Sequence, residues 1–598
     1  MIGTVPQISA GKRVTMSVGS GTTTYNYDTL DRLTTKAAPD GVLSYSYDGA
    51  GNLASMSSNH ANGILVAYAW DELNRLSTVT DSRLLGNQTT TYTYDPASNV
   101  ATVTAPNGLQ TKLNYDSLNR LTSLTTPISS YTYTLGQTGN RIGAVEGNGR
   151  TLSWNYDGIY RLTNETITAD PSQNNGSAAY SLDPVGNRLS LNSSLPGINS
   201  GSFGYNADDQ ISSESYDLDG NVLAAGGNTF VYDAENHMTS ANNGAVRMIY
   251  DGDGNRVAKI VNGVTTQYLV DDLNPTGLPQ VVEEVVNGAV TRQYTYGLQR
   301  ISENQSINGA WTTSFYVYDG AGSVRQLANY NGAVTDEYGY DAFGYSFTKQ
   351  GTTPNNYLYR GEQFDSDLGL YYLRARYYSP STGRFMSRDP EGGIITDPAT
   401  LHKYFYASGD PVNRIDPSGR MDGATAGPMP STAGIEYALV TLVISIRNIA
   451  AVAAVEVAVV CGLTWDATNT IADVKYGIDK GRGLDAWIER TGPCSVKEKA
   501  RCKPDEDNHH LLPQQFRDWF VKCGFPDIDS PEYMKCVPQN CHTGSGGLHP
   551  EWNQRWRIYI YGRNLGKCPA GGTIAILDFL ADLMNQFQKQ LECIGDDE

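Results

Sequence analysis

The sequence predicts a mainly β protein built from repeated β-hairpins, followed by a small α+β domain at the C-terminus. Three observations predict this: a recurring tyrosine-aspartate pattern over two thirds of the chain, the residue usage of that part, and a change of composition after it. The chain of 598 residues has 62 glycines and 39 tyrosines against 13 phenylalanines. Tyrosine favours half-buried strands and glycine favours turns, so helix bundles are not expected. A chain of this length contains material for several domains.

The overall charge excludes some classes of function. Lys+Arg 44 against Asp+Glu 63 gives a net charge of -19. A chain this acidic is not expected to coat nucleic acid over its whole surface, so any contact with nucleic acid must be local. A mean hydropathy of -0.39 with 18% charged residues excludes a membrane protein overall and a highly charged disordered chain.

A tyrosine-aspartate dipeptide recurs along the N-terminal part at early spacings of 20, 23, 24 and 21 residues. Fuller copies of the unit run from Tyr25 to Leu33 and from Leu113 to Leu121, and a degenerate copy lies around Leu135 to Arg141. The repeated dipeptides begin at Tyr27, Tyr47, Tyr94, Tyr115, Tyr156, Tyr216, Tyr232, Tyr250, Tyr318 and Tyr340, with Trp70-Asp71 and Leu182-Asp183 as variants. A period of this length indicates a repeat architecture.

Each repeat has the residues of one β-hairpin. Alternating Tyr-x-Tyr predicts a strand with one packed face. The aspartate predicts a turn, because its carboxylate can accept from backbone N–H groups two or three residues on. Gly-Asn pairs such as Gly51-Asn52 supply residues that tolerate positive φ, and Arg-Leu starts the return strand. One hairpin is unstable alone, so we expect neighbouring units to pair into a continuous sheet.

The repeats resemble the YD-repeat (Rhs) family from about Tyr25 to Arg420. The segments Tyr357–Asp365, Gly369–Tyr378 and Gly383–Pro390 look like the terminal core signature of that family. The resemblance implies a spiral of strands that closes into a hollow shell around a variable C-terminal domain. An open β-solenoid used for adhesion is the alternative. We therefore predict a shell over residues 1–350, a core terminal region over 351–420, a linker with an apolar helical segment over 421–495, and a further domain over 496–598.

The end of the repeat region resembles a self-cleavage element. Residues 411–419, Pro-Val-Asn-Arg-Ile-Asp-Pro-Ser-Gly, match the family's Pro-x4-Asp-Pro-x-Gly pattern. The resemblance implies an aspartyl-type site that cuts the Arg420–Met421 bond, with Asp416 as the motif aspartate and Asp389 as our suggested partner. Paired carboxylates suit this chemistry, since one can activate water while the other stays protonated. The chain departs from the family, which usually has Leu where Arg420 stands, and Asp-Pro and Ser-Gly also suit a simple turn.

The segment between the repeats and the C-terminal domain gives no membrane span. Residues 421–432 form a Gly/Ala/Pro/Ser linker, and the apolar stretch 435–463 is interrupted by Glu436, Arg447 and Glu456. The longest uncharged run, Tyr437 to Ile446, is too short to cross a bilayer. A packed helix and an amphipathic segment that helps to cross a target membrane are both open. Met1 to Ala10 has no signal-peptide pattern, so we expect export by another route or an upstream segment.

Histidines cluster near the C-terminus with the residues of a metal site. His509-His510 is followed by Leu-Leu-Pro, His542 comes later, and His549-Pro550 precedes Asn553. His549 and Asn553 stand at i and i+4, so they share a face if a helix begins near Pro550. A histidine from a hairpin and this pair from a helix would hold one divalent cation. Surface histidines and a helix cap are the alternative interpretation.

This arrangement resembles the HNH/endonuclease VII-like (His-Me finger) nucleases over about 60 residues. The resemblance implies that His510 is the general base, that His509, His549 and Asn553 bind the metal, and that His542 is a further catalytic-site ligand or phosphate contact, a role it could exchange with Asn540. A neutral imidazole suits a base near pH 7. The metal, Mg, Mn, Zn or Ni, would stabilise charge on the scissile phosphate and leaving oxygen.

All eight cysteines lie in the last part of the chain, at Cys461, Cys494, Cys502, Cys523, Cys536, Cys541, Cys568 and Cys593. In an exported domain they could form disulfides. Cys523, Cys536 and Cys541 could instead join a histidine at a structural zinc, although no Cys-x-x-Cys pair is present. Both interpretations stay open.

The favoured hypothesis is a secreted polymorphic toxin of the Rhs type. Its shell would encapsulate a metal-dependent nuclease that cleaves DNA or RNA in a target cell. The resemblance implies a cognate immunity protein and a secretion apparatus as partners. The main alternative is a cell-surface YD-repeat protein that binds protein or carbohydrate and has a non-catalytic, disulfide-bonded tail. A third hypothesis is a C-terminal metal-dependent hydrolase of peptides.

Overall fold

The computed structural model describes residues 8–9, 12–84, 88–390, 393, 398–420 and 424–425, and two strands at 506–510 and 534–538. The chain divides into two compact units, Met1–Tyr437 and Ala438–Glu598. Helical turns among the described residues are limited to the 3₁₀ helices η1 (Asn242–Gly244), η2 (Tyr359–Gly361), η3 (Pro398–Leu401) and η4 (Ala407–Gly409). No helix in this part of the chain is long and apolar enough to cross a membrane. The mainly β prediction for the repeat region is confirmed, whereas the predicted α+β domain lies largely outside the described residues.

The first sheet contains the repeats nearest the N-terminus, and each strand pairs antiparallel with its neighbour in sequence. Its strands are β3 (Thr15–Val18), β4 (Gly21–Tyr27), β5 (Leu33–Ala38), β6 (Gly41–Tyr47), β7 (Leu53–Ser58), β8 (Leu65–Trp70), β9 (Leu76–Asp81), β10 (Thr89–Tyr94), β11 (Val100–Thr104), β12 (Gln110–Tyr115), β13 (Leu121–Thr125), β14 (Ser130–Leu135), β15 (Arg141–Glu146), β16 (Thr151–Tyr156), β17 (Leu162–Thr168), β18 (Gly176–Leu182), β19 (Arg188–Ser193) and β20 (Gly201–Ser202). The predicted pairing of neighbouring hairpins into one continuous sheet is confirmed.

A second sheet of 14 strands follows in the same up-and-down order. Its strands are β21 (Ser215–Tyr216), β22 (Val222–Ala225), β23 (Asn228–Tyr232), β24 (Met238–Ala241), β25 (Val246–Tyr250), β26 (Arg256–Val261), β27 (Val264–Asp271), β28 (Gln280–Val286), β29 (Ala289–Tyr296), β30 (Arg300–Ile307), β31 (Ala310–Tyr318), β32 (Val324–Ala328), β33 (Val334–Tyr340) and β34 (Ser346–Gln350). A four-stranded sheet then contains β35 (Gln363–Asp365), β36 (Leu370–Leu373), β37 (Arg376–Ser379) and β38 (Arg384–Phe385).

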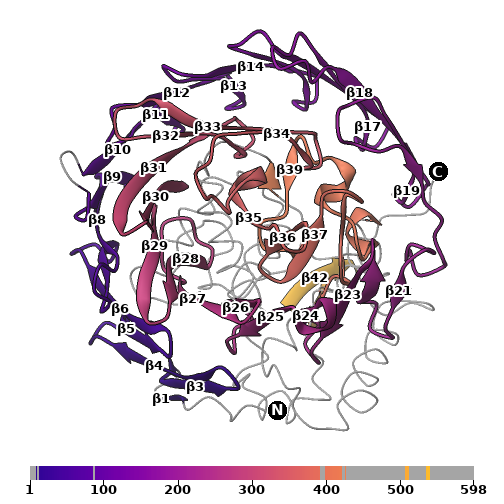
Figure 1. Cartoon of the computed structure of the whole chain (residues 1–598). Helices are drawn as coiled ribbons and strands as arrows, with labels where there is room; N and C mark the ends of the chain where they lie inside the picture. The colour runs from indigo at the N-terminus through magenta and orange to yellow at the C-terminus, as the bar shows by residue number, and fades with distance from the viewer. Residues whose placement is uncertain are drawn as a thin grey trace, which may run out of the picture. The chain divides into compact units, whose positions relative to one another are not determined.

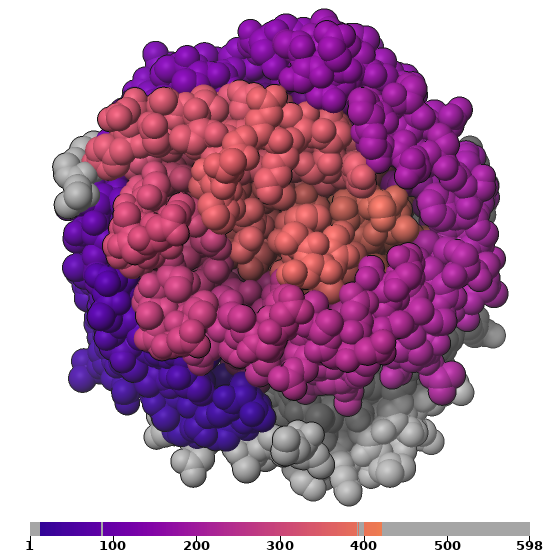
Figure 2. All heavy atoms as spheres, viewed as in Figure 1, coloured from indigo at the N-terminus to yellow at the C-terminus, as the bar shows by residue number. Residues whose placement is uncertain are grey.

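Three short two-stranded pairs complete the described strands. They are β1 (Ile8–Ser9) with β2 (Lys12–Arg13), β39 (Arg414–Ile415) with β40 (Ala424–Thr425), and β41 (Glu506–His510) with β42 (Met534–Pro538). Within the first unit, the strands from β3 to β19 run along the periphery in Figure 1, and β28 to β33 lie inside them. The described residues of 351–420, which include β35 to β37 and are called the central stretch below, occupy the centre of the face seen in Figure 2.

The turn of each repeat is built by its aspartate. Asp116 Oδ1 accepts from the backbone N–H groups of Leu118 at 2.9 Å and of Arg120 at 3.0 Å, and Oδ2 accepts from Arg120 Nε at 2.7 Å. The donors thus lie two and four residues on, rather than two or three. These hydrogen bonds, the side-chain one first, lower the pKa of Asp116. The position before the basic residue takes positive φ, as Asn119 does at 58°.

Copies with Gly-Asn use the same turn with a different division of roles. Gly51 takes the positive φ, at 92°. Asn52 does not have positive φ, and its Nδ2 donates to Asp48 Oδ2 at 3.0 Å, where other copies have an arginine. The prediction that both residues of the pair serve a positive φ is therefore correct for glycine and wrong for asparagine, which closes the turn through its side chain.

In most copies the aromatic residue before the turn ties its hairpin to the preceding one, whereas the hydroxyls of Tyr216 and Tyr232 donate to Glu214 and to the carbonyl oxygen of Met386. Tyr47 OH donates to the carbonyl oxygen of Leu33 at 2.7 Å, and Trp70 Nε1 does the same to Leu53 at 2.8 Å. In each case the acceptor lies at the start of the preceding return strand. Equivalent bonds are donated by Tyr27, Tyr94, Tyr115, Tyr156, Tyr205, Tyr250, Tyr296, Tyr318 and Tyr340. Phenylalanine has no hydroxyl to donate, which accounts for the dominance of tyrosine at this position.

Tyr47→Phe is expected to lower the free energy of unfolding by about 1 kcal/mol, because it removes one intramolecular hydrogen bond while keeping the ring. Tyr345→Phe is the matched control, since no hydrogen bond of the Tyr345 hydroxyl occurs among the described residues. Urea unfolding followed by tyrosine and tryptophan fluorescence measures both variants. Equal midpoints for the two would contradict the role of the hydroxyl.

The two large sheets share one hydrophobic core and a set of buried polar contacts. The main apolar cluster joins Leu43 and Leu124 of the first sheet with Phe315 and Leu327 of the second. Tyr45 OH donates to Asp271 Oδ1 across the two sheets at 2.9 Å, and burial raises the pKa of Asp271 to about 6.

The central stretch packs on the end of the second sheet through the same kind of contact. Tyr378 OH donates to the carbonyl oxygen of Phe343 at 2.7 Å, and Tyr371 OH donates to that of Gly344 at 3.1 Å. These bonds fix the position of β36 and β37, on which the candidate site described below depends.

Candidate functional site

The two aspartates predicted as a catalytic pair come from different segments of the central stretch. Asp416 directly follows β39 and is 1% exposed. Asp389 follows β38, and its side chain is 13% exposed. The backbone N–H of Asp389 donates to the carbonyl oxygen of Lys403 at 2.8 Å, which fixes the segment that carries this aspartate.

One arginine on β37 brings both aspartates together. Arg376 Nη2 lies 2.8 Å from Asp389 Oδ2 and 3.2 Å from Asp416 Oδ2. Arg376 Nε donates to the carbonyl oxygen of Gly419. The guanidinium lies over the ring of Phe385, 3.6 Å from its centroid, and the Arg376 side chain is 1% exposed. The sequence analysis suggests Asp389 as the partner of Asp416 but does not single out this arginine, which stands within the segment Gly369–Tyr378 of the family signature.

The turn after Asp416 holds the expected scissile bond close to its carboxylate. Asp416 Oδ1 accepts from Ser418 Oγ at 3.3 Å and from the backbone N–H of Arg420 at 3.2 Å. Gly419 has φ of 67°, and a Cβ there would stand 2.2 Å from the carbonyl oxygen of Leu373. Only glycine fits this position, because the conformation and the space both exclude a side chain. Met421, on the far side of the expected bond, lies outside the described residues.

The arrangement supplies one buried carboxylate, Asp416, one partly buried carboxylate, Asp389, and one cation beside the turn that ends at Arg420. A guanidinium favours the ionised form of a neighbouring carboxyl group. General acid-base cleavage needs one carboxylate as base and one protonated carboxyl as acid. The site therefore has the groups that such a reaction requires, provided that one proton is added to the pair. The catalytic roles of Asp389 and Asp416 stay predictions.

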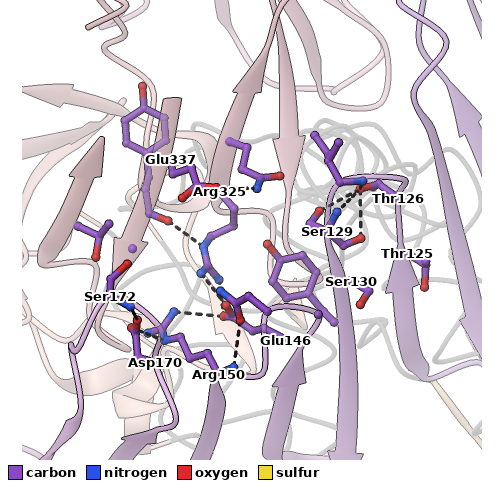
Figure 3. Close-up of a pocket in the computed structure, with 18 of the residues that line it drawn as sticks. Thr125, Thr126, Ser129, Ser130, Glu146, Arg150, Asp170, Ser172, Arg325 and Glu337 are labelled. Carbon is purple, nitrogen blue, oxygen red and sulfur yellow. Dashed lines mark hydrogen bonds and ion pairs between the residues drawn. The ribbon is translucent and has the colours of Figure 1, made fainter. Parts of the chain in front are cut away.

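A pocket of about 430 Å³ lies apart from the candidate cleavage site, and no sequence pattern pointed to it. It lies between the loops that join β13 to β18 and the strands β32 to β34 (Figure 3). Glu146 accepts from Arg325 at 2.8 and 3.1 Å and from Arg150 at 3.1 Å, and Arg150 also lies 3.4 Å from Asp170. Burial works against ionisation of Glu146, but the two guanidinium groups outweigh it and lower its pKa. Because both arginines of the lining already pair with carboxylates, charge alone does not select a ligand here.

The residues predicted as a metal-dependent nuclease site are only partly within the described residues. His509 and His510 are successive residues of β41, which pairs antiparallel with β42 so that His509 faces Lys535 in register and His510 faces Met534. His542, His549 and Asn553 lie outside the described residues, as do seven of the eight cysteines, whereas Cys536 lies on β42 and pairs in register with Asn508. The described residues contain no group of three or more His, Cys, Asp or Glu side chains that could hold a metal ion.

Comparison with known families and curated proteins gives matches to the repeat architecture. The model of the Teneurin YD-shell family matches residues 22–141 and 138–412, which is more than half of the chain. The tRNA3(Ser)-specific nuclease WapA of Bacillus spizizenii is 34% identical over 367 residues, covering 59% of this chain and 15% of that protein. The tRNA nuclease WapA of Bacillus subtilis is 32% identical over 254 residues, covering 40% and 11%. The toxin protein Tse5 of Pseudomonas aeruginosa is 42% identical over 62 residues, covering 10% and 4%.

The matches to these curated relatives extend over a small part of their length, 15% or less. Among solved structures, the crystal structure of TcdB2-TccC3-Cdc42 superposes with a TM-score of 0.57 at 18% identity, covering 69% of this chain and 24% of that one. TcdB2-TccC3 without its hypervariable C-terminal region superposes with a TM-score of 0.57 at 19% identity, covering 69% and 25%. At such identities the likeness shows the fold, which agrees with the strand order described above.

Proposed function

The chain belongs to the Teneurin YD-shell family, and from this premise we propose that it is a toxin whose YD shell carries a C-terminal metal-dependent nuclease. The observation that supports this most directly is the 34% identity to a tRNA-specific nuclease over 59% of the chain. The shorter match to the toxin protein Tse5, over 10% of the chain, supports a role as a toxin. Transfer RNA is the first substrate to test, and DNA is the second.

The proposed nuclease site rests on residues of the second unit. His510 would act as general base, and His509, His549 and Asn553 would hold the divalent ion, with His542 as a further ligand or phosphate contact. Three imidazoles and one amide suit Zn, Ni or Mn better than Mg alone. When bound, such an ion supplies stabilisation of the charge that develops on the phosphate and the leaving oxygen. The placement of His509 and His510 on a paired strand supports the proposal.

Expression of the full chain in a bacterial host, with and without His510→Ala, tests the nuclease. We expect the unaltered chain to degrade host tRNA or DNA, seen on denaturing and agarose gels, and His510→Ala to abolish it. His237→Ala is the matched control, because this histidine belongs to a repeat turn where it pairs with Asp233 at 3.3 Å. Intact nucleic acid and normal growth with the unaltered chain would favour a surface-binding protein, and damage to protein or cell wall would favour a peptide hydrolase.

The same proposal includes cleavage of the chain at Arg420–Met421 by Asp416 and Asp389. Water would add to the carbonyl carbon of Arg420, and the C–N bond to Met421 would break, leaving a carboxyl group on Arg420 and an amine on Met421. One carboxylate takes the proton from water, and a protonated carboxyl donates to the leaving nitrogen. The joint contact of both aspartates with Arg376 supports this. Intact-mass measurement of the purified chain should find fragments of residues 1–420 and 421–598, and a single uncut species would contradict it.

The proposed toxin needs partners that match its activity. A producing cell that makes a nuclease requires an immunity protein that blocks it, and delivery into a target cell requires a secretion apparatus. The chain is therefore proposed to be exported and to act inside another cell. Rescue of the expressing host by a neighbouring gene of the producer would identify the immunity protein.

A further inference from the structure

We infer that Arg376 is a positioning residue for the proposed cleavage, because its guanidinium holds both aspartates and the turn before the scissile bond in one arrangement. The inference rests on the proposed cleavage at Arg420–Met421 and deepens it. Arg376 does not itself touch the expected reacting atoms in any contact described above. Its action would pass through Asp389, Asp416 and Gly419.

All three nitrogens of the Arg376 guanidinium make polar contacts. Nη2 reaches Asp389 Oδ2 at 2.8 Å and Asp416 Oδ2 at 3.2 Å, and Nη1 donates to the carbonyl oxygen of Lys403 at 3.2 Å. Nε donates to the carbonyl oxygen of Gly419, which immediately precedes Arg420. These partners come from separate segments of the central stretch, so Arg376 connects the segment of Asp389 to the turn that already holds Asp416.

The surroundings of Arg376 leave little freedom for another placement. Its side chain is 1% exposed, and the face of the Phe385 ring lies 3.6 Å from the guanidinium carbon. A planar guanidinium has five N–H donors in a fixed fork and stacks on aromatic rings, whereas a lysine ammonium is a compact charge on a flexible chain. Lysine at this position would keep the charge but not all four contacts. The site therefore requires arginine for geometry and not only for charge.

The energetic role of Arg376 follows from the two negative charges that it pairs with. Two carboxylates brought to one place repel each other, and the repulsion grows when water is excluded. A shared cation removes this repulsion and lets Asp389 and Asp416 stay close before the reaction. Without Arg376, the repulsion between the two carboxylates is no longer offset, and Asp389 loses the ion pair that holds it near Asp416, whereas Asp416 keeps its hydrogen bonds to Ser418 and Arg420. Small displacements of reacting groups are costly, with a shift of about 1 Å lowering a rate by about 100-fold.

Arg374 provides a matched control two residues away. Its Nη1 pairs with both carboxylate oxygens of Glu362 at 3.0 Å and donates to the carbonyl oxygen of Pro417, and its Nε donates to the carbonyl oxygen of Pro279 at 3.1 Å. Arg374 thus supports the same turn from a partly buried position, with a side chain 14% exposed, but contacts neither Asp389 nor Asp416. Loss of Arg374 removes structural support without removing the contacts that Asp389 and Asp416 make with Arg376.

The test compares cleavage of the full-length chain in Arg376→Gln, Arg376→Lys and Arg374→Gln. Each protein is purified and incubated, the fraction cut is followed by gel and intact mass, and the melting temperature is measured in parallel. We expect Arg376→Gln to slow cleavage by about 100-fold, Arg376→Lys to recover part of the rate, and Arg374→Gln to stay within about threefold of the unaltered chain. If Arg376→Gln does not fold, Arg376→Lys, which keeps the charge, replaces it in the test. Its cleavage rate is then expected to be lower than that of Arg374→Gln, and equal rates would contradict the inference.

Two results would overturn the inference while leaving the proposed cleavage intact. One is cleavage of Arg376→Gln at the rate of the unaltered chain, and the other is an equal slowing by Arg376→Gln and Arg374→Gln at equal melting temperatures, which would indicate structural support only. An unaltered chain that is never cut would instead remove the proposed cleavage itself, and with it any positioning role.

Discussion

Asp416→Asn is expected to leave the full-length chain uncut, with a loss of cleavage rate of about 1,000-fold. A positioned acid or base contributes roughly 100- to 10,000-fold to such a reaction, and an amide can neither take a proton from water nor donate one to the leaving nitrogen. Asparagine keeps an oxygen that can accept from Ser418 Oγ and the backbone N–H of Arg420, so the turn is expected to persist. The measurement is the fraction of chain cut at Arg420–Met421 over time, by intact mass.

Asp410→Asn is the matched control for this prediction. Asp410 is buried in the same segment, at 4% exposure, and its carboxylate accepts from Asn413 Nδ2 at 2.9 and 3.0 Å without contact to Arg376. We expect cleavage in Asp410→Asn to remain near that of the unaltered chain. A chain with Asp416→Asn that is cut at the same bond and rate would remove Asp416 from the reaction.

Arg256→Met is expected to lower the free energy of unfolding of the first unit by about 3–5 kcal/mol, because it leaves a buried carboxylate without its main partner. The Arg256 side chain is fully buried, and it contacts Asp365 Oδ2, Tyr377 OH at 2.5 Å and Gln363 Oε1 at 2.9 Å. Burial works against ionisation of Asp365, but the charges of Arg256 and Lys259 outweigh it and lower its pKa. Without Arg256, the carboxylate of Asp365 keeps one cation, Lys259 at 2.9 Å, and one neutral donor, Tyr377 OH at 3.2 Å.

The double variant Arg256→Met with Asp365→Leu is expected to recover part of the lost stability, because no uncompensated charge then remains. Melting temperatures of the single and double variants measure the difference. Tyr377 lies on β37 beside Arg376, so a loosened Arg256 contact is also expected to slow the proposed cleavage. A single variant as stable as the unaltered chain would show that Arg256 does not lock the central stretch to the second sheet.

The candidate cleavage site was predictable from the sequence only in part. Asp416 belongs to a recognisable motif, and Asp389 was chosen as a partner from the neighbouring signature. The structure brings the two to one guanidinium, while their catalytic roles stay predictions. The sequence analysis does not identify Arg376 as a site residue. A signal was present, because Arg376 stands directly before two tyrosines in Leu-Arg-Ala-Arg-Tyr-Tyr, and a charge among residues that favour burial must have partners. Nothing in the local pattern identifies those partners, because they lie in other segments.

The repeat architecture is a property that the sequence alone determined. Each hairpin depends on contacts between residues a few positions apart, such as Asp116 with Leu118 and Arg120, and such contacts repeat wherever the pattern repeats. The hydroxyl of Tyr47 adds a link to the adjacent hairpin, so local units assemble in chain order. What the pattern left open was the detail of the turn, where asparagine closes it through its side chain in place of a positive φ.

Only the tertiary structure decided which distant segments meet. The pairing of Arg256 with Asp365, the cavity around Glu146 and the junction at Arg376 each join parts of the chain that no repeat unit connects. Local sequence fixes a strand and its turn through hydrogen bonds within a hairpin, but the partner of a buried charge is set by how the sheets pack, since a charge removed from water must pair wherever packing places it.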